Sequence, residues 1–148
     1  PYTTLFRSLA EKTGKLMSKD AAKRYETIQW VFFQMAGVGP IFGQVGFFHK
    51  FAGKEIEDKR PLHRYVKESA RVLGVLEDRL AGRKWIMGDD YTIADIATFP
   101  WVRNLVGFYE AGDLVALPDI PPVTRALQAF IARPAVGKGL TIPARTPA

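Results

Sequence analysis

The chain has 148 residues, 47% of them hydrophobic and 12% aromatic, which suits one folded domain with a sizeable core and excludes a disordered chain. Cysteine is absent, which excludes disulfides, thiolate nucleophiles and cysteine metal sites. The net charge of +6 comes from basic residues interleaved with acids, a pattern that favours solvated helix faces over a nucleic-acid interface.

Residues 1–8 read as the in-frame translation of a common sequencing-library adapter, so we exclude them from the fold argument. The next segment, Leu9–Lys15, is typical of a helix end, with Gly14 as its C-cap. We expect residues 9–17 to be the tail of a preceding unit and a linker, residues 18–140 the main domain, and residues 141–148 a flexible tail.

A first long helix is predicted from Ser18 onward, because four apolar residues recur at helical spacing: Tyr25, Ile28, Phe32 and Met35. Gly37–Pro40 interrupts this pattern, and we expect a kink or a restart of the helix there.

Beyond that kink, Gly39, Gly43 and Gly46 share one helical face, where another backbone or a ligand can come close. A group of aromatic residues lies beside them: Phe42, Phe47, Phe48, His49 and Phe51. Two interpretations stay open. The aromatic residues form a packed helix–helix seam, which we favour, or they line a ligand pocket and part of a dimer interface.

A second long helix is predicted with Pro61 in its first turn and Gly82 after its end. Its apolar stripe consists of Leu62, Val66, Ser69, Leu73, Leu76 and Leu80. A second face carries Arg60, Arg64, Lys67 and Arg71, and a solvated basic stripe is the simpler interpretation of it.

The stretch Tyr91–Val102 predicts a buried central helix, because nearly every residue after its first turn is apolar. Thr92 suits the N-cap, and Asp95 can reach back to its N–H to complete a capping box, so both roles are structural. We expect a bend at Pro100, and Arg103 is a weaker candidate for a cleft or interdomain contact. A short helix around Val123–Ile131 completes an all-α fold, a bundle of about five main helices.

The string W-I-M-G-D-D-Y-T-I-A-D-I-A-T-F-P-W-V (Trp85–Val102) resembles the capping-box motif in the C-terminal helical domain of cytosolic glutathione transferases. Gln29–Gln44 and Glu68–Leu73 are similar to helices of the bacterial Nu class, the disulfide-reductase-like group. Leu9–Lys15 resembles the end of the thioredoxin-like domain that precedes the helical domain in that family. The resemblance extends from Leu9 to about Leu140.

This resemblance implies a homodimeric parent enzyme that uses glutathione as co-substrate, with a small electrophile or a disulfide as its partner. It implies that Arg71 binds the glutathione carboxylate, since a guanidinium can hold a carboxylate with two hydrogen bonds. Gln34, Phe48 and His49 are candidate pocket residues on the same ground. The thiol-activating groups of the family lie in the N-terminal domain, so the resemblance assigns no catalytic residue here, and we expect this chain to be inactive by itself.

The alternative is a non-catalytic protein-interaction module, because transferase-like helical domains also serve as adaptors. Two histidines are too few to form a zinc site alone, and we expect no metal. No apolar run approaches the length of a membrane span, and no signal-peptide pattern opens the chain. We expect a soluble cytoplasmic protein with neither a membrane nor a nucleic-acid partner.

Overall fold

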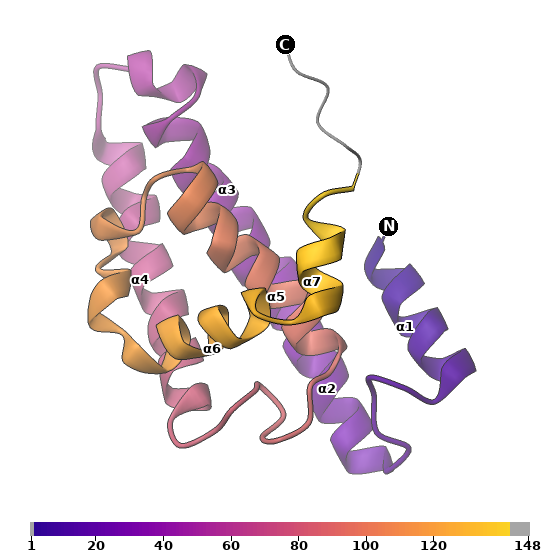
Figure 1. Cartoon of the computed structure of the whole chain (residues 1–148). Helices are drawn as coiled ribbons and strands as arrows, with labels where there is room; N and C mark the ends of the chain where they lie inside the picture. Colours follow the sequence, from indigo (N-terminus) through magenta and orange to yellow (C-terminus); the bar gives the residue numbers. More distant parts are fainter. Residues whose placement is uncertain (1, 143–148) are drawn as a thin grey trace.

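The computed structural model describes residues 2–142, which form a helical bundle without a β-strand. The α-helices are α1 (Tyr2–Thr13), α2 (Ala21–Phe33), α3 (Gly39–His49), α4 (Arg60–Leu80), α5 (Ile93–Arg103), α6 (Pro121–Ile131) and α7 (Pro134–Gly139). Figure 1 shows α5 in the middle of the bundle and α1 set to one side. The all-α prediction is confirmed, and α2 to α6 are the expected main helices.

Helix α1 crosses the boundary predicted between residues 8 and 9 and ends before Gly14, whose φ of +64° confirms the predicted C-cap. It packs on the bundle through a small cluster with Ala10, Met17 and Ile93 at its centre. The adapter origin of residues 1–8 stays a prediction. Residues 143–148 of the predicted flexible tail lie outside the described part of the chain.

Helices α2 and α3 form one run joined by a π-helical turn, η1 (Gln34–Val38), which ends two residues before Pro40. The predicted interruption is confirmed: Pro40 has no N–H to donate, and the wider turn accommodates it.

The apolar stripe of α2 faces outward. Tyr25 is 66% exposed, Phe32 63% and Met35 43%. The residues of this run that turn inward include Thr27, Gln34 and Val38. The spacing of the stripe predicted the helix correctly, but most of the stripe does not lie in the core of this chain.

The run Ala21–His49 is long and apolar enough to cross a membrane by length and composition, which the sequence reading did not expect. One such helix is a weak indication, because core helices of soluble proteins pass the same test. Its α3 segment packs against α4, and its α2 segment against α5. These contacts are those of a helix that packs within the bundle.

The glycine face of α3 is closed by aromatic rings from the chain around α5. A Cβ atom on Gly46 would lie 2.6 Å from the ring of Tyr109, and one on Gly39 would lie 3.2 Å from Trp101. Phe42 is fully buried beside them. At these positions the structure shows the packed seam that we favoured. Elsewhere in the predicted aromatic group it does not, because Phe47 is 41% exposed and Phe51 42%.

Helix α4 carries the predicted amphipathic stripe. Ser69, Leu73, Leu76 and Leu80 are buried, as is Val72, and the helix ends just before Gly82, which has a φ of +67°. The main core brings this stripe together with Phe42, Ile86, Phe99, Leu105 and Phe130.

Gly46→Ala tests the seam, because the added methyl group must push the Tyr109 ring aside. We expect it to lower the free energy of unfolding by about 1–3 kcal/mol, the usual cost of overpacking a core. Gly74→Ala is the matched control: it lies inside α4, and a Cβ there meets no atom within 4 Å.

The control should raise stability by about 0.5–1 kcal/mol, because alanine favours the helix over glycine. Urea unfolding followed by circular dichroism measures both variants. Equal effects of the two substitutions would contradict the seam.

Candidate functional site

The amino end of α5 is organised by the buried carboxylate of Asp95, which is fully shielded from solvent. Its Oδ2 accepts the N–H of Thr92 and its Oδ1 accepts the N–H of Ile86, each at 2.9 Å. The Thr92 hydroxyl in turn accepts the N–H of Ala94 at 3.3 Å, and the predicted capping box is present. The bond to Ile86 was not predicted. It fixes the loop before the helix to the helix itself.

Burial raises the pKa of Asp95 from its usual 3.8 to about 6, although the N–H groups of Ile86 and Thr92 and the Thr92 hydroxyl act to lower it. Removal of a carboxylate from water disfavours its charged form more than these hydrogen bonds favour it. Asp95 therefore has the structural role that the sequence predicts, and ionising its carboxyl group in the folded state costs free energy.

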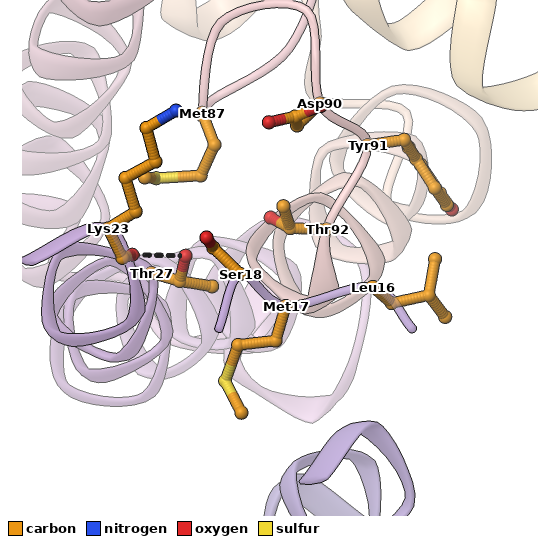
Figure 2. A pocket seen from close by; sticks show the side chains of 9 residues that line it. All are labelled: Leu16, Met17, Ser18, Lys23, Thr27, Met87, Asp90, Tyr91 and Thr92. Carbon is orange, nitrogen blue, oxygen red and sulfur yellow. Dashed lines mark hydrogen bonds between the residues drawn. The ribbon is translucent and has the colours of Figure 1, made fainter. Parts of the chain in front are cut away.

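The linker after α1 is fastened to the same helix end. The carbonyl of Leu16 accepts the N–H of Ile93, the first residue of α5, at 2.9 Å, and Leu16 itself has a φ of +63°. Figure 2 shows the linker beside Thr92, with Lys23 and Asp90 on either side of a hollow of about 200 Å³. Because this hollow is small, we interpret it as the gap where the linker, α2 and the loop before α5 meet.

A larger hollow of about 610 Å³ lies on the basic face of α4. It is lined by Ile41, Arg64, Tyr65, Lys67, Glu68 and Arg71, and we call it the Arg71 hollow. The side chain of Arg71 is 62% exposed and is held by Glu68, with 2.6 Å between Arg71 Nη2 and Glu68 Oε1. Hydrogen bonding to Arg71 lowers the pKa of Glu68.

Two of the predicted site residues lie on one side of the bundle. Phe48 stacks on Tyr65 with their ring centroids 5.8 Å apart and their planes 15° apart, and Tyr65 lines the Arg71 hollow. Phe48 itself does not line this hollow and is connected to it through its contact with Tyr65, so the ligand-binding roles of Phe48 and Arg71 stay predictions. An aromatic surface and an exposed guanidinium stand next to each other.

His49 and Gln34 lie elsewhere. His49 ends α3 near Glu110, whose pKa is lowered first by Lys50 and to a lesser extent by His49. Gln34 is buried in η1, with its amide directed toward Gly39, and its Oε1 has no hydrogen-bond partner in the described part of the chain. Neither residue lines the Arg71 hollow, and their pocket roles stay predictions.

A third hollow, of about 570 Å³, lies between α1, α5 and α7. Arg103, the weaker sequence candidate, lines it together with Asn104 and Arg133, and we call it the Arg103–Arg133 hollow. The guanidinium carbon of Arg133 lies 3.6 Å from the centroid of the Tyr91 ring. Sequence reasoning missed Arg133, whose only signal was its place at a helix end before Pro134.

The described residues contain no group of three or more histidine or acidic side chains that could hold a metal ion, and the whole chain has no cysteine.

A sequence model of the family described as "Glutathione S-transferase, C-terminal domain" matches residues 40–134. The chain is 38% identical over 133 residues to the disulfide-bond oxidoreductase YghU of Escherichia coli, covering 88% of this chain and 46% of that protein. It is 68% identical to a crystallised glutathione transferase of Burkholderia graminis, solved with two glutathione molecules per subunit, at a TM-score of 0.96. This match covers 99% of the chain and 61% of the other.

A glutathione transferase of Pseudomonas putida, solved with glutathione disulfide bound, is 58% identical at a TM-score of 0.94, over 97% of this chain and 62% of the other. The chain spans about half the length of the curated relatives that it matches.

The raised pKa of Asp95 predicts a specific dependence of stability on pH. The folded state holds the proton more tightly than the unfolded state, so the contribution of this group to the free energy of unfolding falls as the pH rises from about 4 to about 6. Asp95→Asn cannot titrate. The stability of the wild type relative to this variant should therefore fall by up to about 3 kcal/mol between pH 4 and pH 7.

Urea unfolding across that pH range measures the difference, with the exposed Asp89→Asn as control. A difference between wild type and Asp95→Asn that does not change with pH would show that the Asp95 carboxylate is not costly to ionise in the folded state.

Proposed function

Because the chain belongs to the glutathione S-transferase C-terminal domain family, we propose that it forms the helical half of a glutathione-dependent enzyme. The reaction of that enzyme is conjugation of glutathione to a small electrophile or glutathione-dependent reduction of a disulfide. Glutathione supplies the reacting thiol in this proposal, and the chain itself contributes no cysteine.

The observation that carries this proposal is the Arg71 hollow. Its guanidinium is exposed and already oriented by Glu68, which reduces the freedom that binding a ligand carboxylate must remove. The stacked pair of Phe48 and Tyr65 adds an apolar surface beside it. A peptide-like ligand with a carboxylate at one end and an apolar substituent at the other matches this pairing.

Glu68 also competes with a ligand carboxylate for the Arg71 guanidinium. An incoming carboxylate must share the Arg71 fork or displace Glu68 from it. Because the pair is largely exposed, such an exchange is inexpensive. Arg64 and Lys67 line the same hollow and add positive charge around the arriving anion.

We further propose that the enzyme is a cytoplasmic homodimer. The support for a dimer is the outward stripe of α2, where Tyr25, Phe32 and Met35 leave a row of large apolar side chains in contact with water. A second copy of the chain is an occupant of the right chemistry for this stripe.

The competing function is a non-catalytic interaction module. It keeps the same fold and the same outward stripe, but it does not need an oriented guanidinium beside an aromatic surface. The Arg71 hollow favours the enzyme.

The first test concerns glutathione binding. Arg71→Ala should weaken the binding of glutathione to the chain by about tenfold, as expected for the loss of a charge-assisted hydrogen bond. Titration followed by amide shifts in NMR spectra measures the affinity. Arg83→Ala is the control, an exposed arginine outside the hollow.

A matched ligand sharpens this result. Glutathione with both carboxylates esterified should bind the wild type as weakly as glutathione binds Arg71→Ala, and the variant should not distinguish the two ligands. An Arg71→Ala variant that binds glutathione like the wild type would refute the assigned role of Arg71.

The second test concerns activity. We expect the 148-residue chain to show no conjugation of glutathione to a chromogenic aryl halide and no reduction of a mixed disulfide above the uncatalysed rates. The reason is that the polar groups of the Arg71 hollow are assigned to the glutathione carboxylate, and the family resemblance places the thiol-activating groups in the preceding thioredoxin-like domain. Measurable turnover by the purified chain would overturn this expectation.

A further inference from the structure

Arg79, near the end of α4, joins three segments of the chain. Its side chain is 15% exposed, and its Nη2 lies 2.6 Å from Oε1 of Glu26 on α2. Its Nε donates to the carbonyl of Ile86 in the loop before α5, and its guanidinium carbon lies 5.2 Å from the centroid of the Trp30 ring. An ion pair, a carbonyl and an aromatic face therefore fix the orientation of this guanidinium.

A further contact of the same guanidinium is with a methionine. Nη2 of Arg79 donates to Sδ of Met87 over 3.6 Å, and a thioether sulfur is a weak acceptor. Because each terminal nitrogen of a guanidinium carries two N–H groups, Nη2 serves Glu26 and Met87 at once. A more strongly accepting group on this sulfur would find a charged donor already directed at it.

Met87 is also open to small molecules. It is half-buried and lines the hollow of about 200 Å³ beside the linker, together with Lys23 and Thr27 (Figure 2). The two other methionines of the chain differ from it: Met17 is 8% exposed and Met35 is 43% exposed. Within the described residues, neither of them accepts a hydrogen bond from a cation, as Met87 does.

From this geometry we propose that Met87 is a site of reversible oxidation by hydroperoxides, and that Arg79 binds the sulfoxide that forms. The sulfur lone pair forms a bond to the outer oxygen of the hydroperoxide, and the O–O bond breaks. The leaving oxygen keeps the electron pair of that bond and receives the proton of the transferred oxygen. With hydrogen peroxide the products are the sulfoxide and water, so the sulfur loses two electrons and the peroxide gains them.

Oxidation at this site tightens the loop before α5. The sulfoxide oxygen brings the acceptor nearer to Nη2 than the 3.6 Å of the thioether sulfur, into the range of about 2.7–3.2 Å of a charge-assisted hydrogen bond. Ile86, the preceding residue, already binds Arg79 through its carbonyl and Asp95 through its N–H. The sulfoxide therefore adds a second bond between α4 and the loop that holds the α5 cap.

This effect is the opposite of the usual one, because oxidation ordinarily places a polar group in apolar surroundings and destabilises the fold. Neither Met87 nor Arg79 lines the Arg71 hollow, so the site does not depend on the proposed glutathione contact.

Treatment of the chain with hydrogen peroxide, followed by mass spectrometry of its proteolytic peptides, measures each methionine separately. We expect Met35 and Met87 to be converted and Met17 to react at least about tenfold more slowly, because its sulfur is shielded. Conversion of Met87 as slow as that of Met17 would show that the hollow does not admit a peroxide, and it would overturn the proposal.

The stereochemistry of the product reports the position of Arg79. One lone pair of the Met87 sulfur faces the guanidinium, so the two sulfoxide epimers should form unequally. The two classes of methionine sulfoxide reductase, applied to the peptides, each reduce one epimer. One of them should reverse most of the Met87 sulfoxide, whereas each should reverse about half of the Met35 sulfoxide. Equal epimers at Met87 would contradict the assigned contact.

The binding of the sulfoxide is read from thermal unfolding. Met35→Leu leaves Met87 as the methionine that the peroxide reaches, and its Tm should stay unchanged or rise on oxidation. When Arg79→Leu is added, oxidation should lower the Tm by at least about 3 °C, since the sulfoxide then has no donor. Arg83→Leu, at an exposed arginine just after α4, is the matched control and should leave the response of Met35→Leu unchanged. An equal fall of the Tm with and without Arg79 would refute the proposal.

Two substitutions of Met87 test the same contact with Arg79 in place, and they decide the question even where Arg79→Leu does not fold. Met87→Gln supplies a carbonyl oxygen to the guanidinium, and Met87→Leu keeps only the apolar shape. Met87→Gln should have a Tm equal to or above that of Met87→Leu, although a polar group at a half-buried position ordinarily costs stability. A lower Tm of Met87→Gln would show that Arg79 does not bind an acceptor at this position.

Discussion

The buried carboxylate of Asp95 is the interaction on which the rest of this fold depends. It accepts N–H groups from the N-cap of α5 and from the loop nine residues earlier, so one side chain fixes both the start of the central helix and the course of the chain into it. The linker adds a third attachment, through the Leu16 carbonyl and the first N–H of α5. Three segments meet at one helix end: the Asp95 carboxylate accepts N–H groups of the loop and the N-cap, and the Leu16 carbonyl accepts the first N–H of the helix.

The site residues take their positions from this arrangement. Tyr91 precedes the N-cap, packs edge-to-face against Trp85 and lies against the Arg133 guanidinium, while Ile96 and Arg103 follow on the same helix. The Arg71 hollow has a different origin. It lies on α4, whose buried stripe of Leu73, Leu76 and Leu80 turns the basic face outward. The central helix therefore defines one hollow, and the amphipathic pattern of a neighbouring helix defines the other.

Sequence reasoning succeeded where a signal is local. The Thr92 and Asp95 spacing predicted the capping box, and glycine and proline predicted where helices end or kink. It missed the bond from Asp95 to Ile86, because a loop N–H leaves no pattern in the sequence. Sequence reasoning found the helical period of Tyr25 and Phe32 but did not show that this face is exposed to solvent. Periodicity defines which residues share a helix face, and it does not define what that face packs against. Arg133 was missed because its partner, Tyr91, lies on another segment.

The two π-helical turns affect the phase of the helices that form the glycine seam. One extra residue in a turn rotates everything after it by about 100° relative to an uninterrupted α-helix. The turn η1 precedes Gly39 and Gly46 in α3, and the turn η3 (Asn104–Phe108) ends the α5 run directly before Tyr109. The same offset thus occurs on both sides of the contact between Gly46 and Tyr109. In the run from α2 to α3, the helix before η1 packs against α5 and the helix after it packs mainly against α4, so the two parts of one run present different faces to the bundle.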